Sequence, residues 1–164
     1  MPCVTICVRF YNNNNNNNRA EIPSSKEPLG SLSRDDGKRP DGLTLVPWHS
    51  GHSATWDVTV VHTLAASYVA QSAVQAGKAA EIAAERESVK YSGLSSSHIF
   101  IPVAVESLGP LADDAHRFIT EIGRRMTFST GDPRETAFLY QRISVAIQRY
   151  NAVCLTNTFI YNPS

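Results

Sequence analysis

Cysteine, net charge and long apolar runs are all scarce in this chain. Its 164 residues include three cysteines and no CxxC pair, so neither a disulfide scaffold nor a structural zinc site is expected. Its 15 basic side chains balance 15 acidic ones, which excludes a polybasic protein that binds nucleic acid through bulk charge. The longest apolar run, residues 99–105, is too short to span a bilayer, so no membrane partner is expected. No secretion signal opens the chain, and we expect an intracellular protein.

Residues 1–37 differ in composition from the rest of the chain. An unbroken asparagine run fills residues 12–18, and proline, serine and glycine are frequent over residues 23–33. Such a segment has too little apolar surface to offset its chain entropy, so it is predicted to be disordered. We therefore divide the chain into a disordered low-complexity segment, 1–37, and one domain, 38–160.

The domain has the pattern of a mixed α/β fold. Runs rich in β-branched residues predict strands, and alanines at helical spacing predict a long helix. Gly77 is a weak point at which this helix is expected either to bend or to divide. The first two strands are joined by a short polar turn, which predicts a hairpin. In chain order, the expected elements are strands at 43–46 and 55–61, a helix at 63–91, a strand at 98–105, and helices at 111–128 and 134–155.

Two aspartates are candidates for a metal site. Asp41 opens the first strand and Asp57 lies within the second, so a hairpin can bring their carboxylates together. Two carboxylates hold a hard divalent ion and leave positions for water and phosphate. Ordinary interpretations stay open: Asp41 before Gly42 is typical of a turn, and strand parity can place Asp57 on a solvated face. Glu106 either joins this acidic cluster or ends its strand in solvent.

The chain resembles a family at these positions. Residues 38–41 (KRPD), fifteen intervening residues, residues 57–60 (DVTV) and Lys90-Tyr91 resemble the restriction-like endonuclease domain of non-LTR retrotransposons. That domain belongs to the PD-(D/E)XK superfamily and lies C-terminal to the reverse transcriptase. The similarity covers about residues 32–159 and implies a truncated piece of such a protein. It also implies a restriction-endonuclease-like core, in the order strand-strand-helix-strand followed by two helices.

The resemblance implies a function for several residues. It implies a metal-dependent nick in target DNA that primes reverse transcription, with Mg²⁺ (or Mn²⁺) held by Asp41 and Asp57. Lys90 and Tyr91 complete the implied catalytic set. The implied partners are DNA and the reverse transcriptase domain of the parent element, and the implied location is nuclear. Candidate DNA contacts are Arg39, Arg124 and Arg125; the alternative for the last two is a favourable charge near a helix end.

Glu87 departs from the family pattern. Thr59 stands where restriction enzymes of the superfamily carry lysine, and the retrotransposon branch places its lysine one helical turn before the tyrosine, which is Glu87 here. Helical spacing points Glu87 in the direction of Ala80, towards the sheet, with Lys90 roughly 60° away and within reach of the site. Two functions therefore compete: an endonuclease that uses Lys90, and a degenerate transposon-derived fragment that binds DNA weakly without cleavage. An unrelated helical interaction module would require both aspartate signals to be coincidental.

Overall fold

A computed structural model describes residues 20–28, 32, 39–94 and 97–158 of the chain. Strands and helices alternate along it in the manner of a mixed α/β domain, which confirms the predicted class. In chain order the elements are β1 (Ser24–Lys26), β2 (Gly42–Thr44), β3 (Ala54–Val61), α3 (Val69–Ser72), α4 (Lys78–Lys90), a 3₁₀ turn η1 (Ser92–Leu94), β4 (Ile99–Glu106), α5 (Asp113–Thr130) and α6 (Glu135–Thr158).

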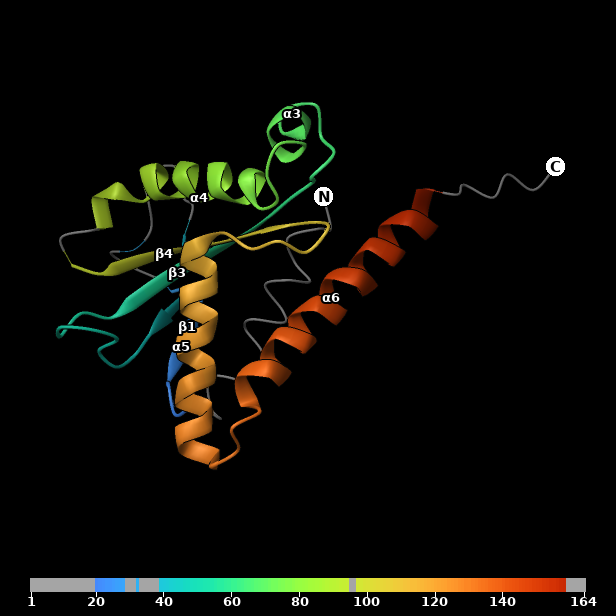
Figure 1. Cartoon of the computed structure of the whole chain (residues 1–164). Helices are drawn as coiled ribbons and strands as arrows, with labels where there is room; N and C mark the ends of the chain where they lie inside the picture. The colour runs from blue at the N-terminus through green and yellow to red at the C-terminus, as the bar shows by residue number, and fades with distance from the viewer. Residues whose placement is uncertain (1–19, 29–31, 33–38, 95–96, 159–164) are drawn as a thin grey trace.

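The described strands form one mixed sheet in the order β1-β2-β3-β4 (Figure 1). The β1–β2 and β2–β3 pairs are antiparallel, so the predicted hairpin is confirmed. The β3–β4 pair is parallel, and the chain crosses between these strands through α3 and α4. A parallel pair needs such a crossover because the chain must return to the same end of the sheet before the next strand begins.

Helices cover both faces of the sheet (Figure 1). Alternate residues of β3 point to opposite faces. Trp56 and Val58 pack with Phe118 of α5 in the larger hydrophobic core, which α6 completes. Val61 packs with the alanines of α4 in a second, smaller core on the other face. Residues 57 and 59 share the parity of Val61 and therefore point towards α4.

The alanines of α4 let that helix lie close to the sheet. Its buried residues are Ala79, Ala80, Ala83 and Ala84, which confirms the predicted burial of Ala80 and Ala83. The helix predicted over 63–91 is divided at Gly77, one of the two outcomes expected there, and its first residues, 63–68, are not helical. Gly77 has a left-handed backbone (φ +84°) and begins α4, so the preceding alanines at 73 and 76 lie outside any helix and are exposed.

β1 lies within residues 1–37, for which the sequence predicts no regular structure. Its sequence, Ser-Ser-Lys, has no apolar alternation, and it is held by backbone pairing to β2. The neighbouring Ile22 is buried in the larger core. The asparagine run and the apolar residues 4–11 lie outside the described residues.

α5 and α6 start and end within a few residues of the predicted helices. α6 buries one face, while Ala152 and the residues that follow it up to 156 are exposed. In Figure 1 this last part of the helix leads away from the sheet. Within the described ranges, no helix is both long enough and apolar enough to cross a membrane.

Candidate active site

Asp41 and Asp57 meet on the α4 face of the sheet. Gly42 pairs with Trp56 across the antiparallel β2–β3 ladder. Asp41, just before Gly42, therefore lies opposite Asp57, just after Trp56. An oxygen of Asp41 (Oδ2) accepts the backbone N–H of Val58 at 2.7 Å, which fixes its orientation. Asp57 is half-buried under α4. The structure therefore brings the two predicted carboxylates together.

Gly42 begins a strand and does not form the tight turn that the alternative interpretation of Asp41-Gly42 requires. A side chain at position 42 would overlap the indole ring of Trp56, which lies against the glycine backbone. The glycine is thus required by a close approach between two strands. Its effect is to hold the chain at Asp41 near β3.

Lys90 completes the group from the last turn of α4. Its ammonium nitrogen (Nζ) donates to Asp57 Oδ2 at 3.0 Å and to Glu87 Oε2 at 2.7 Å. The side chains of Lys90 and Asp57 are only 25% and 13% exposed, so this ion pair is largely shielded from water. The flexible lysine thus reaches the carboxylates, as its helical position predicts.

Glu87 faces the sheet, one turn before Tyr91. Thr59, two residues after Asp57 on the same strand face, donates its hydroxyl to Glu87 Oε1 at 3.4 Å. The other carboxylate oxygen accepts from Lys90. The helical spacing from Ala80 predicts this direction correctly. The sequence did not reveal the link between Thr59 and Glu87, although strand parity places Thr59 beside Asp57.

Tyr91 is buried beside the site and packs on Phe100, with ring centroids 4.6 Å apart. The ammonium of Lys90 lies 4.6 Å from the centre of the Tyr91 ring, a favourable cation–π distance. Burial raises the pKa of Tyr91 to about 12. The phenol is therefore neutral near pH 7 and acts here as one wall of the site.

The site holds more negative charge than its environment favours. Burial, followed by the charge of Asp41, raises the pKa of Asp57 to about 7 against the opposing effect of Lys90. Burial also raises the pKa of Asp41, although the N–H of Val58 and a hydrogen bond with Asp57 lower it. Burial lowers the pKa of Lys90, but the hydrogen bond to Glu87 and the charge of Asp57 outweigh that and raise it above its ordinary value. Lys90 therefore stays charged.

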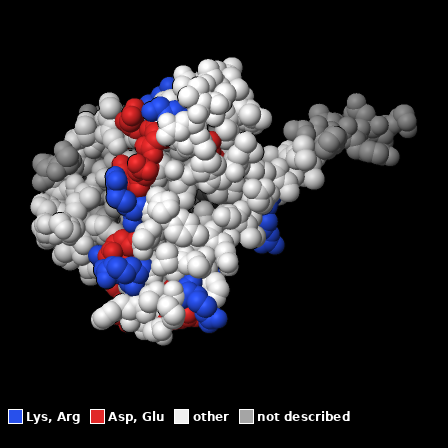
Figure 2. Space-filling model, in the orientation of Figure 1, with Lys and Arg blue, Asp and Glu red and all other residues white. Residues whose placement is uncertain are grey.

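The candidate DNA-contacting arginines are engaged with carboxylates. Arg39 lies 3.8 Å from Glu27, and both Arg124 and Arg125 donate to Glu121 at 2.7 Å. The guanidinium of Arg125 also stacks on Trp48, 4.2 Å from the ring centre. On the face shown in Figure 2, described basic and acidic side chains lie next to one another and form no broad basic area. At these arginines, a neighbouring carboxylate partly offsets the positive charge that would attract a DNA phosphate.

Glu106 neither joins the acidic cluster nor ends β4 in solvent. It is 1% exposed, and its Oε1 accepts the backbone N–H of Ala79, in the first turn of α4, at 3.0 Å. A carboxylate is stabilised there by the unpaired N–H groups and the dipole of the helix N-terminus. Glu106 pairs with Val61, four residues beyond Asp57 in β3, so it lies towards the other end of the strand.

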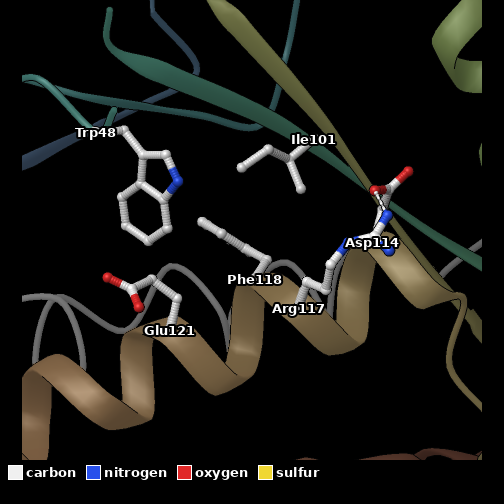
Figure 3. Close-up of a pocket in the computed structure, with 6 residues that line it drawn as sticks. All are labelled: Trp48, Ile101, Asp114, Arg117, Phe118 and Glu121. Carbon is white, nitrogen blue, oxygen red and sulfur yellow. Dashed lines mark hydrogen bonds and ion pairs between the residues drawn. The ribbon is translucent and has the colours of Figure 1, made fainter. Parts of the chain in front are cut away.

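A cavity of about 240 Å³ lies on the opposite face of the sheet (Figure 3). Trp48 comes from the β2–β3 loop and Ile101 from β4, while Asp114, Arg117, Phe118 and Glu121 come from α5. Ile101 packs against the larger core, whereas its neighbour Pro102 pairs with Asp57. Adjacent strand residues face opposite ways, so this cavity is not part of the carboxylate site.

Within the part of the chain that the structure describes, no group of three or more His, Cys, Asp or Glu side chains is arranged to hold a metal. Asp41 and Asp57, which lie side by side on the α4 face, remain the two candidate ligands that the sequence predicts. Comparison with models of known protein families finds no match, and comparison with curated proteins finds no significant one.

Proposed function

We propose that this chain is a metal-dependent DNA endonuclease domain with a restriction-endonuclease-like core, which nicks target DNA to prime reverse transcription of a retrotransposon. The observation that carries the proposal is the contact between the Lys90 ammonium and Asp57, at 3.0 Å, with Asp41 beside them immediately before the neighbouring strand β2. Two acids and a lysine from three separate elements meet at one place, which is the group of residues that the resemblance implies.

The two carboxylates suit a hard divalent cation. Mg²⁺ is commonly held by one or two carboxylates, with water and phosphate oxygens as its other ligands. Asp41 and Asp57 would hold Mg²⁺ or Mn²⁺. The positive ion would favour ionised Asp57, whose pKa is raised in the metal-free site by burial and by the charge of Asp41. The ion would supply an activated water and stabilise negative charge on the phosphate when bound.

The protein groups position this chemistry. The N–H of Val58 orients Asp41, and the α4 helix carries Lys90 over the sheet. A fixed ammonium in a largely shielded site stabilises charge that develops on a phosphate more strongly than one in water. Tyr91 and Phe100 form an apolar wall next to it.

A non-cleaving, transposon-derived fragment with weak DNA contact is the second candidate. It is favoured by Glu87, which stands where the family places its lysine. It is also favoured by the ion pairs that occupy Arg39, Arg124 and Arg125.

Nicking of supercoiled plasmid in Mg²⁺ separates the two candidates. We expect the natural chain to nick and Asp57→Asn to lose at least about 100-fold, because one of two metal ligands is removed. Asp114→Asn is the matched control, since it makes the same change on the opposite face of the sheet, and it should nick normally. Equal nicking by the natural chain and Asp57→Asn would exclude the metal-ligand role. Absence of nicking in the natural chain would favour the second candidate.

A further inference from the structure

Lys90 is shared between two carboxylates. Its ammonium lies 2.7 Å from Glu87 and 3.0 Å from Asp57, and each acid belongs to a different element. Glu87 is on the same helix three residues earlier, whereas Asp57 is on β3. The lysine can therefore leave one carboxylate without leaving the other.

The contact with Asp57 occupies an oxygen that a metal would use. Asp57 Oδ2 accepts from Lys90, and Asp41 Oδ2 accepts from the backbone of Val58. A divalent cation that approaches Asp57 would meet a positive charge about 3 Å from the ligand oxygen. Like charges repel strongly at such distances in a shielded site. The ammonium and the metal therefore compete for Asp57.

The two carboxylate oxygens of Glu87 have different partners. Its Oε1 accepts from Thr59, and its Oε2 accepts from Lys90. The long contact with Thr59, at 3.4 Å, places the glutamate beside the sheet, and the short contact at 2.7 Å keeps the ammonium next to it. Glu87, the residue at which the sequence departs from the resembled family, is thus the partner of the lysine.

We infer that Lys90 is a built-in counter-ion of Asp57 that a divalent cation displaces, and that Glu87 is a positioning residue that retains the displaced ammonium at the site. The inference rests on the proposed metal-dependent function. Metal binding then switches Lys90 between two states. In the metal-free protein the ammonium is bound to Asp57; with metal bound it is free of Asp57 and available to the phosphate of a substrate. Lys90 thereby offsets part of the negative charge of the metal-free site, and it leaves Asp57 only when a divalent cation enters.

Mn²⁺ binding to the full chain, measured by titration calorimetry without DNA, tests whether Lys90 competes with the metal for Asp57. We expect Lys90→Met to bind Mn²⁺ about tenfold more tightly than the natural chain, because the competing charge is removed. Lys78→Met is the matched control: it makes the same change at the opposite end of α4, on an exposed side chain, and should alter the affinity less than about twofold.

The outcomes separate the inference from the proposed function. If Asp57→Asn weakens Mn²⁺ binding but Lys90→Met leaves it unchanged or weaker, Lys90 is not a counter-ion that the metal displaces. The proposed metal site at Asp57 then stands. If Asp57→Asn, Lys90→Met and the natural chain all bind Mn²⁺ equally poorly, the inference and the metal-dependent function are both overturned.

Acetylation of Lys90 by acetic anhydride, followed by mass spectrometry with and without Mg²⁺, tests the role of Glu87. In the natural chain Mg²⁺ should change the modification rate little, because the ammonium stays paired with Glu87. In Glu87→Gln, Mg²⁺ should raise the rate several-fold, since no anion then retains the displaced lysine. Glu85→Gln, an exposed neighbour on α4, should behave like the natural chain. Identical responses in Glu87→Gln and the natural chain would overturn the positioning role.

Discussion

The ammonium of Lys90 lies 3.0 Å from Oδ2 of Asp57, although 33 positions separate the two residues in the chain. The contact joins the last turn of α4 to the middle of β3. It depends on the crossover between parallel strands, which lays α4 along the sheet, and on the buried alanines that bring the helix close. The candidate site is therefore a product of the fold as a whole.

Removal of the Asp57 charge should stabilise the metal-free protein. Burial and the charge of Asp41 both disfavour ionised Asp57, and Lys90 does not outweigh them. We expect Asp57→Asn to raise the Tm at pH 8 by a few degrees, since about 1 kcal/mol corresponds to about 2–4 °C for a domain of this size. Calorimetry in EDTA measures this. A lower Tm than that of the natural chain would mean that the Lys90 pair dominates.

The free energy of unfolding should depend on pH through Asp57. Its pKa is raised from 3.8 to about 7, so the folded metal-free protein binds a proton that the unfolded chain releases. This group therefore makes stability fall as the pH rises from about 4 to 7. The charged and titratable groups that face Asp57 are Asp41 at the start of β2, and Glu87, Lys90 and Tyr91 from the α4 side.

NMR of the Asp57 side-chain carboxyl carbon measures this pKa directly. We expect a midpoint near 7 in the natural chain. Asp41→Asn should lower that midpoint because it removes the nearby like charge. A midpoint below 5 in the natural chain would show that Lys90 compensates Asp57 fully.

Gly42 should not tolerate a side chain. A methyl group there would overlap the indole of Trp56, which is 1% exposed and cannot move without disturbing the larger core. We expect Gly42→Ala to lower the free energy of unfolding in urea by about 1–3 kcal/mol. Gly93→Ala, where a methyl group meets nothing within 4 Å, should change it by less than about 0.5 kcal/mol. Equal stability of the two variants would show that the close β2–β3 approach is not required.

Glu106 should matter for stability and not for the site. Glu106→Ala leaves the N–H of Ala79 without its partner and should cost about 1–3 kcal/mol, whereas Glu106→Gln keeps an acceptor and should cost less. Urea unfolding of both variants, with the exposed Glu85→Ala as control, measures this difference. Mn²⁺ affinity of Glu106→Gln should match that of the natural chain. A large loss of that affinity would place Glu106 in the acidic cluster after all.

Local pattern was enough to predict the hairpin and the meeting of Asp41 with Asp57. Both depend on two short strands joined by a polar turn, where pairing is set by nearby residues. The direction of Glu87 also followed from local spacing, because Ala80 lies seven residues earlier within the same helix. These features need no information from distant parts of the chain.

Features set by distant contacts could not be predicted in the same way. β1 has no apolar pattern, and it forms because its backbone pairs with that of β2. Glu106 is buried because the start of α4 supplies an N–H donor 27 positions away in the chain. Gly77 was expected either to bend or to divide the long helix, and the choice depends on a left-handed backbone that glycine permits but does not require. Each of these outcomes is decided by tertiary structure.

Plasmid nicking in Mg²⁺ by the natural chain and by Lys90→Ala decides whether Lys90 is the lysine of the site, because its ammonium joins α4 to Asp57. We expect nicking by the natural chain and a loss of about 10²–10⁴-fold in Lys90→Ala. Glu87→Lys, which places a lysine where the resembled endonuclease domains carry one, should add little to the natural activity. An inactive natural chain that gains activity with Glu87→Lys, or a Lys90→Ala variant as active as the natural chain, would contradict the assignment of Lys90.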